Sequence, residues 1–450
     1  MDGLGVSRRR FLAGMVGAAS GASAGAVATA LPALAGPTGP PSQSPRTLSP
    51  EVANDWIDVL YDVVLAEGLT PPNAARVYNY CTLAMYEAAV AGMPAHRSLG
   101  GQLSGLGALP LPRRGVPLDW PSAVSASVAT VAGTLFSDAS DASRARITAA
   151  DAALVDARRA AGVPAPILAG SREHGRKVGE ALLAWIAGDG FAGIVGMPYT
   201  PPTGPDRWRS TPPNFGVAIE PHWEQVRPMV LRSAVEVEPE PHVAFSVEPG
   251  SAFHDQALAT YETSRHLTDE HRAIARFWTD NPRTSGLPSG HWLLLVKQVA
   301  RARALRLDTT LEAYARAGVA LHDAFLNCWA WKYRINLLRP VSYVQDHIDP
   351  TWATFVNTPQ FPEYTSGHSV ASRSVATVLS DLLGTVAFTD ESHLVRGMPA
   401  RHFSSFFAAA DEAAQSRLFG GIHFPMGIEA GKAQGDQVGA LVVARLHTRR

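Results

Sequence analysis

Lysine and cysteine are both scarce in this chain. Lysine and arginine together number 39 against 40 aspartates and glutamates, and only four of those cations are lysines. The formal net charge of −1 offers no broad attraction to a phosphate backbone, which argues against nucleic acid as a partner. Two cysteines, Cys81 and Cys328, are too few for a disulfide framework or a structural zinc site. We interpret them as buried thiols and leave a single disulfide between them open.

Long apolar runs and strand-like alternation are missing as well. Beyond residue 35 no stretch of about twenty apolar residues occurs, so we do not expect an integral membrane protein. Hydrophobic residues make up 46% of the chain, enough for a sizeable core. Apolar residues recur at helical spacing from Val52 onward, which predicts an all-α fold of bundled helices in one large domain, residues 52–450. Helices are expected over 52–64, 75–90, 123–135, 142–162, 171–186, 257–263, 269–279, 291–305, 309–338, 368–383, 404–419 and 429–446, with an irregular stretch over 188–250.

The N-terminus reads as a targeting segment. An arginine run, Arg8-Arg9-Arg10, precedes Phe11-Leu12 and an uncharged small-residue stretch that ends at Ala33-Leu34-Ala35. This pattern resembles a bacterial twin-arginine signal peptide over residues 1–35, followed by a flexible lead-in over 36–51. A membrane anchor is the weaker alternative, because the stretch is rich in Gly, Ala and Ser. We therefore expect export to the periplasm or the exterior.

Three ordered segments between residues 329 and 423 carry the chemistry. The first holds Lys332 and, seven residues later, Arg339-Pro340, a spacing that predicts both cations on one helix face. The second is Ser366-Gly367-His368 at the start of a predicted helix, where backbone N–H groups favour an anion. These segments supply two cations, a hydroxyl group, a backbone amide and an imidazole.

The third segment pairs Arg417 with His423. Gly420-Gly421 between them ends the helix, so the chain can turn the imidazole back toward the guanidinium group. Together the three segments describe a site for a tetrahedral oxyanion. One imidazole bonds to the central atom, and the other acts as an acid or base at the opposite oxygen.

The order of the three segments makes the combination specific, although each segment alone is less specific. Arg-x5-His is expected about once by chance in this composition, whereas Lys-x6-Arg-Pro is expected about 0.02 times. A second Ser-Gly-His, Ser289-Gly290-His291, lies upstream of the lysine and so outside the order. We interpret His291 as a packing residue at a helix start, and His322, His347 and His402 as ordinary surface or core residues.

The ordered set resembles the superfamily of vanadium-dependent haloperoxidases and type 2 phosphatidic acid phosphatases. Residues 361–368 and 323–332 are similar to bacterial haloperoxidase-type members in particular, and weaker similarity covers 71–89 and 221–228. The resemblance implies a helical fold with two four-helix bundles and orthovanadate as the prosthetic group. The matching residues are Lys332, Arg339, Pro340, Ser366, Gly367, His368, Ser416, Arg417 and His423.

The resemblance also implies roles. His423 would bond to vanadium, while Lys332, Arg339, Ser366, Gly367 and Arg417 would hold the equatorial oxygens. His368 would be the acid/base at the far apex, and Lys332 would polarise hydrogen peroxide for attack by a halide, giving hypohalous acid. In the phosphatase branch, phosphate takes the same site, His423 is the nucleophile and His368 protonates the leaving group.

Three positions bear on the branch. Trp329 and Phe361 resemble aromatics near the halide position of fungal chloroperoxidases, although simple core packing is an equal alternative. Many members carry an Asp four residues after the ligand histidine, where this chain has Gly427. Glu429, Asp436 or a backbone carbonyl would have to replace it.

Three functions therefore stay open. They are a haloperoxidase, a secreted acid phosphatase, and a non-catalytic oxyanion-binding homologue. The halide, the organic acceptor and the oligomeric state, a homo-oligomer included, are not fixed by the sequence.

Overall fold

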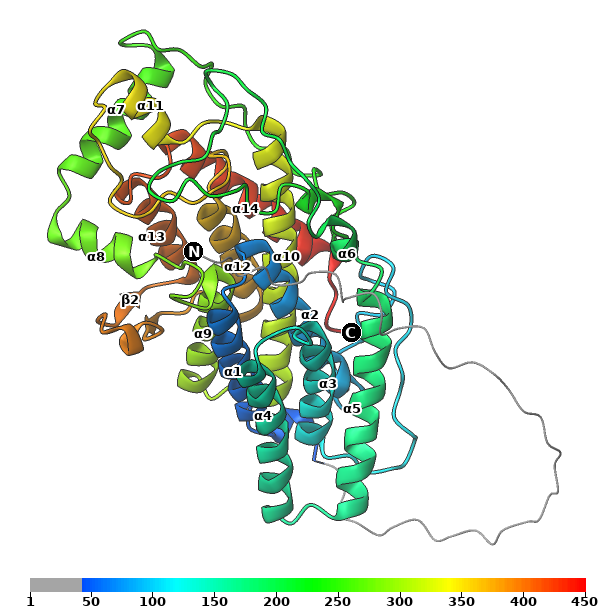
Figure 1. Cartoon of the computed structure of the whole chain (residues 1–450). Helices are drawn as coiled ribbons and strands as arrows, with labels where there is room; N and C mark the ends of the chain where they lie inside the picture. The colour runs from blue at the N-terminus through cyan, green and yellow to red at the C-terminus, as the bar shows by residue number, and fades with distance from the viewer. Residues whose placement is uncertain (1–42) are drawn as a thin grey trace, which may run out of the picture.

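The structure, a computed structural model, describes residues 43–450, and its regular secondary structure is almost entirely helical (Figure 1). This confirms the predicted all-α class. The α-helices are α1 (Glu51–Glu67), α2 (Pro71–Ala89), α3 (Trp120–Leu135), α4 (Asp141–Ala160), α5 (Ala165–Ile186), α6 (Phe191–Ile194), α7 (Ala252–Arg265), α8 (Asp269–Phe277), α9 (Leu287–Ala302), α10 (Leu307–Ile335), α11 (Pro340–His347), α12 (Gly367–Leu383), α13 (Phe406–Phe419) and α14 (Pro425–Arg445). Short 3-10 helices are η1 (Pro45–Thr47), η2 (Val90–Gly92), η3 (Trp223–Gln225) and η4 (Leu394–Arg396).

Helix α10 joins two groups of helices. On one side it packs against α2 and α9, which contact α1, α3 and α5. On the other side it packs against α12 and α14, which contact α13. In Figure 1 the blue and cyan helices of the first group lie below the brown and red helices of the second, with α10 running between them. Motifs carried by α10, α12 and α13 are thereby brought to one end of the second group.

Helix α10 ends earlier than predicted. It stops at Ile335, because Asn336 adopts a left-handed conformation (φ 58°) and its backbone N–H bonds to the carbonyl of Lys332. Arg339 is extended (φ −81°, ψ 155°), as expected before a proline, and Pro340 opens α11. The prediction that Lys332 and Arg339 share one helix face is therefore wrong. Helix α11 was not predicted either.

The structure adds one small sheet. Strands β1 (Phe388–Asp390) and β2 (Arg401–Phe403) pair antiparallel, with Thr389 opposite His402. Three residues are too few to produce a readable alternation, so periodicity could not predict this strand pair.

The long irregular stretch is tied to α10 by a buried carboxylate. Asp323 accepts hydrogen bonds from the backbone N–H groups of Met229, Val230 and Leu231 at 2.7, 2.8 and 3.0 Å.

The thiols of Cys81 and Cys328 are both buried and unpaired. Within residues 43–450, no helix has both the length and the apolar character needed to cross a bilayer.

A row of glycines sets the contact between α14 and α12. Gly427, Gly431, Gly435 and Gly439 recur every four residues and so share one helix face. A Cβ atom on Gly439 would lie 2.6 Å from Cβ of Thr377 and 2.8 Å from the carbonyl oxygen of Ser374. The two helices can approach this closely only because these side chains are absent.

We expect Gly439→Val to destabilise the protein by about 1–3 kcal/mol, because the added methyl groups overlap α12. Urea unfolding followed by circular dichroism measures the change in the free energy of unfolding. Ala440→Val, at an exposed position of the same helix, is the matched control. Equal stability of the two variants would contradict the close approach.

Candidate active site

The three sequence motifs meet at one cavity. Its volume is ≈70 Å³, which is enough for a small anion and a few water molecules. Gly367, His368, Arg417 and His423 line it, together with an aromatic and aliphatic wall. The other motif residues, Lys332, Arg339 and Ser366, are fully buried directly behind this lining.

Lys332 lies in the last turn of α10 and is held by main-chain oxygens. Its ammonium group donates to the carbonyls of Pro362 (3.0 Å), Glu363 (2.8 Å) and Thr365. Burial lowers the pKa of Lys332 to about 7. The lysine therefore fixes the backbone that leads into Ser366, and its charge lies beside the cavity without a direct carboxylate partner.

The two arginines are also bonded mainly to neutral oxygens. Arg339 donates from Nε to the carbonyl of Phe361 (2.8 Å) and from Nη1 to that of Ile422 (2.9 Å). Arg417 donates from Nη2 to the carbonyl of Trp278 at 2.8 Å. Nη2 of Arg339 is buried and has no hydrogen-bond partner in residues 43–450. A buried cationic donor without an acceptor is costly unless an anion completes it, so this donor set fits an oxyanion.

His423 is held in one tautomer by two different partners. Its Nδ1 lies 2.7 Å from Oε1 of Glu363, which also accepts the backbone N–H of Phe424 at 3.0 Å. Its Nε2 lies 3.1 Å from Nη1 of Arg339. Because arginine only donates, Nε2 must carry the lone pair and Nδ1 the proton. Burial, with Arg339 next, lowers the pKa of His423 well below its ordinary value, so the ring is a neutral nucleophile or ligand.

Glu363 supplies the carboxylate that many members of the superfamily carry at the position of Gly427. A Cβ atom at Gly427 would contact the Glu363 carboxylate, 2.7 Å from Oε2, so the missing side chain makes room for it. Neither substitute named from the sequence serves, because Glu429 pairs with Lys432 and Asp436 with Arg373. A carboxylate behind His423 is therefore present, and it comes from Glu363, three residues before Ser366.

His368 lies in the first turn of α12, after the N-cap residue Ser366. Its Nε2 lies 3.0 Å from the carbonyl of Trp278 and therefore donates, which leaves the lone pair on Nδ1. Burial and the nearby charge of Arg417 lower the pKa of His368 to about 3. In this state the ring is neutral near neutral pH and holds no proton on Nδ1 that it could supply.

Trp329 and Phe361 form the aromatic wall of the cavity. Their ring centroids are 4.7 Å apart, and the ammonium nitrogen of Lys332 lies 5.8 and 5.2 Å from them. A Cβ atom on Gly367 would lie 3.3 Å from the Trp329 ring, so glycine lets this ring cover the start of α12. Both aromatics are buried and also reach the cavity.

Sequence reasoning missed three contributors to the site. Glu363 was read only as part of a motif, and its proximity to Gly427 left no signal in the sequence. Trp278 and Asp280, in the link after α8, were not considered, although Asp280 lines the cavity. Of the other histidines, His402 is exposed on β2, His322 bonds to the carbonyl of Arg227, and His347 packs on Tyr343.

Comparisons with known proteins agree with this geometry. A family model described as the VCPO second helical-bundle domain matches residues 312–449. The crystal structure of the first bacterial vanadium-dependent iodoperoxidase is 36% identical, with a TM-score of 0.83, over 90% of this chain and 98% of that one. No curated protein matches the sequence.

More distant structures share the fold. The holo-type bacterial vanadium-dependent chloroperoxidase is 14% identical, with a TM-score of 0.58, over 84% of this chain and 92% of that one. The apo-type structure is 15% identical, with a TM-score of 0.62, over 83% and 93%. With the iodoperoxidase match, the chain belongs to the vanadium-dependent haloperoxidase family.

Moving the carboxylate from position 363 to position 427 tests the role of Glu363. Loss of a carboxylate behind a ligand histidine typically costs 10–100-fold in affinity, so we expect Glu363→Ala to weaken orthovanadate binding by about that much. Gly427→Asp alone should also weaken binding, because two carboxylates collide. The combined variant should bind more tightly than either, as titration calorimetry would measure.

Ala433→Asp, at an exposed position of α14, is the control and should bind as the wild type does. A combined variant that binds no better than Glu363→Ala would contradict the exchange.

The affinity for sulfate, which forms no bond from its central atom to a histidine, should fall as pH rises through about 7. Below that pH Lys332 is charged, and Glu363, whose pKa burial raises to about 7, is neutral. Both changes add positive charge to the site, so each proton favours anion binding by up to about tenfold per pH unit. Sulfate keeps its double charge between pH ~5 and ~9, so calorimetric sulfate titrations isolate the protein's contribution. A flat pH profile would contradict this prediction.

Proposed function

We propose that this protein is a vanadate-dependent haloperoxidase that oxidises halide with hydrogen peroxide to hypohalous acid. One observation carries the proposal. The neutral His423 carries its lone pair on Nε2, which accepts from Nη1 of Arg339, beside a cavity surrounded by three buried cations, Lys332, Arg339 and Arg417. That arrangement suits a negatively charged oxyanion whose central atom accepts a nitrogen ligand.

The donors divide between the central atom and its oxygens. Nε2 of His423 would hold the vanadium atom, and Nη2 of Arg339, a buried donor without a partner in residues 43–450, would donate to one of the vanadate oxygens. Arg417 and the backbone N–H of Gly367, at the start of α12, complete this ring of donors. Ser366 and Lys332 lie directly behind it, where the lysine contributes positive charge. When bound, vanadate supplies the Lewis-acidic centre at which hydrogen peroxide is activated.

His368 separates this proposal from the phosphatase alternative. A phosphatase needs a protonated acid to assist the leaving alkoxide. His368 is neutral, with Nε2–H bonded to a carbonyl and the lone pair on Nδ1. Such a ring holds no proton on Nδ1 with which to protonate a leaving group. The same neutral Nε2 of His423 suits a phosphohistidine nucleophile, so the phosphatase stays the second candidate.

The aromatic wall supports a halide position. We assign Trp329 and Phe361 to it, because both rings reach the cavity beside the ammonium group of Lys332. Polarisable rings next to a positive charge suit a large, weakly hydrated anion. Iodide is the first substrate to test, since it is the halide most easily oxidised and the 36% identical relative is an iodoperoxidase.

Export and domain organisation belong to the same proposal. The twin-arginine pattern of residues 1–35 supports secretion to the periplasm or the exterior, and it lies outside the described residues. We propose that residues 52–450 form the single catalytic domain that is exported.

The purified chain, loaded with orthovanadate, should oxidise iodide only when hydrogen peroxide is present. His423→Ala should abolish turnover, because vanadate loses its protein ligand. Lys332→Ala should lower kcat by more than it weakens vanadate binding, because the lysine's charge assists peroxide activation. Triiodide absorbance measures turnover, and calorimetry measures the affinity.

Lys432→Ala is the matched lysine control, because Lys432 pairs with Glu429 on α14 and contacts no site residue. Peroxide-independent hydrolysis of a phosphomonoester, with no halide oxidation after vanadate loading, would favour the phosphatase. Failure in both assays with intact vanadate binding would favour the non-catalytic homologue.

A further inference from the structure

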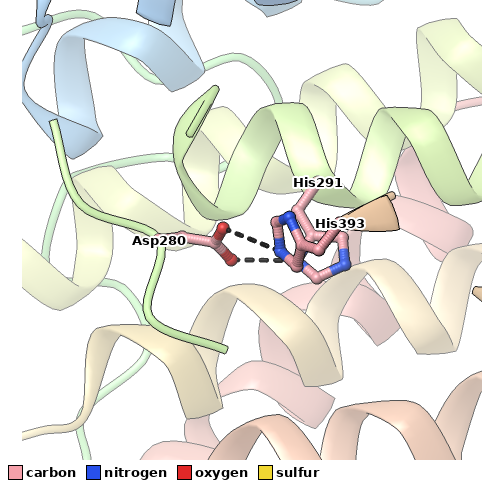
Figure 2. Close-up of side chains that lie close together, drawn as sticks. All are labelled: Asp280, His291 and His393. Carbon is pink, nitrogen blue, oxygen red and sulfur yellow. Dashed lines mark hydrogen bonds and ion pairs between the residues drawn. The ribbon is translucent and has the colours of Figure 1, made fainter. Parts of the chain in front are cut away.

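A second cluster of titratable side chains reaches the cavity through Asp280. Figure 2 shows three of its members, Asp280, His291 and His393. It contains His291 from α9, Asp280 from the link after α8, Asp390 from β1 and His393 from the turn before η4. All four side chains are buried. His291 was expected only to pack at a helix start, and nothing in the mechanism above uses it.

His291 is held between two carboxylates. Its Nδ1 lies 2.9 Å from Oδ2 of Asp280, and its Nε2 lies 2.7 Å from Oδ2 of Asp390. An ionised carboxylate only accepts, so both ring nitrogens must donate, and the ring is an imidazolium cation. Asp390 is itself anchored, because its Oδ1 accepts the backbone N–H of Ser392 at 2.9 Å.

The protons in this cluster argue against a metal ion. A divalent cation would need lone pairs on the imidazole nitrogens. Nη1 of Arg396 lies 3.3 Å from Nδ1 and 3.5 Å from Nε2 of His393, so a guanidinium cation already lies against this ring. Nε2 of His393 lies 3.4 Å from Oδ1 of Asp280. His291, which donates from both ring nitrogens, has no lone pair for a cation, and Arg396 supplies positive charge beside His393.

The cluster touches the cavity through the segment 278–280. The indole of Trp278 stacks on the His291 ring, with centroids 4.6 Å apart and planes at 27°. The carbonyl of Trp278 accepts from Nη2 of Arg417 at 2.8 Å and from Nε2 of His368 at 3.0 Å. His291 therefore contacts this segment at both ends, because its ring stacks on Trp278 and its Nδ1 donates to Asp280.

We propose that His291 is a permanently charged positioning residue, which fixes segment 278–280 and thereby aims Arg417 and His368 at the oxyanion. The proposal rests on the proposed function only for the identity of that anion. Burial opposes the charge, but Asp390 and Asp280 outweigh it and raise the pKa of His291 to about 10. Burial would raise the pKa of Asp280, but its interactions with His291 and His393 hold that pKa well below its usual range.

A double-mutant cycle tests whether His291 acts through Asp280. His291→Gln and Asp280→Asn should each weaken orthovanadate binding by about tenfold, the lower end of the usual cost of removing such a support. The double variant should bind no more weakly than Asp280→Asn alone. His402→Gln, on the exposed face of the same hairpin, should bind as the wild type does. Losses that multiply, or unchanged affinity in His291→Gln, would overturn the proposal.

The charge on His291 can be measured without a variant and without turnover. In the wild-type chain labelled with ¹⁵N-histidine, one ring should keep both N–H protons at a pH well above ~6.5, where ordinary histidines are neutral. Absence of such an imidazolium signal would overturn the proposal even if His291→Gln does not fold. So would one tightly bound divalent metal ion per chain, found by elemental analysis of the purified protein and lost in His291→Gln. A chain that shows the imidazolium and the coupling but no halide oxidation would overturn only the proposed function.

Discussion

Three cationic side chains buried without direct carboxylate partners are the constraint on which the site depends. Removing a charge from water costs several kcal/mol per ion, and a carboxylate at contact would offset that cost only by cancelling the charge. Here Lys332, Arg339 and Arg417 donate mainly to main-chain carbonyls. Carbonyl oxygens satisfy the donors and leave the net charge in place. The protein thus keeps positive charge available for an anion.

Carboxylates act one step away from these cations, on either side of the cavity. Glu363, three residues before Ser366, supports His423, and Asp280 supports the chain that holds Arg417 and His368. Each active-site imidazole consequently has one nitrogen fixed as a donor and the other left as a lone pair. Both rings line the cavity, and because their partners differ, the lone pair is on Nε2 in His423 and on Nδ1 in His368.

The sequence predicted the helical class, most helices and the order of the motifs, since these depend on local periodicity and spacing. Ser366 as a helix start and the Gly420-Gly421 turn follow from local rules as well. What could not be predicted depends on contacts between distant segments. The role of Glu363 follows only once α14 is seen to lie against its loop. His291 follows a Ser-Gly pair as His368 does, yet its function is set by two carboxylates about 10 and 100 residues away in sequence.

The glycine face of α14 sets the distance between α14 and α12, and with it the spacing of the two active-site histidines. His368 stands at the start of α12, and His423 lies two residues before α14 begins. Because these helices are locked together at glycine contacts, the separation of the two imidazoles is set by helix packing and not by a loop. The conformational entropy of ordering the site is thus lost during folding, before any anion arrives. Anion binding then requires only diffusion and desolvation, and the backbone conformation should be the same with and without the bound anion.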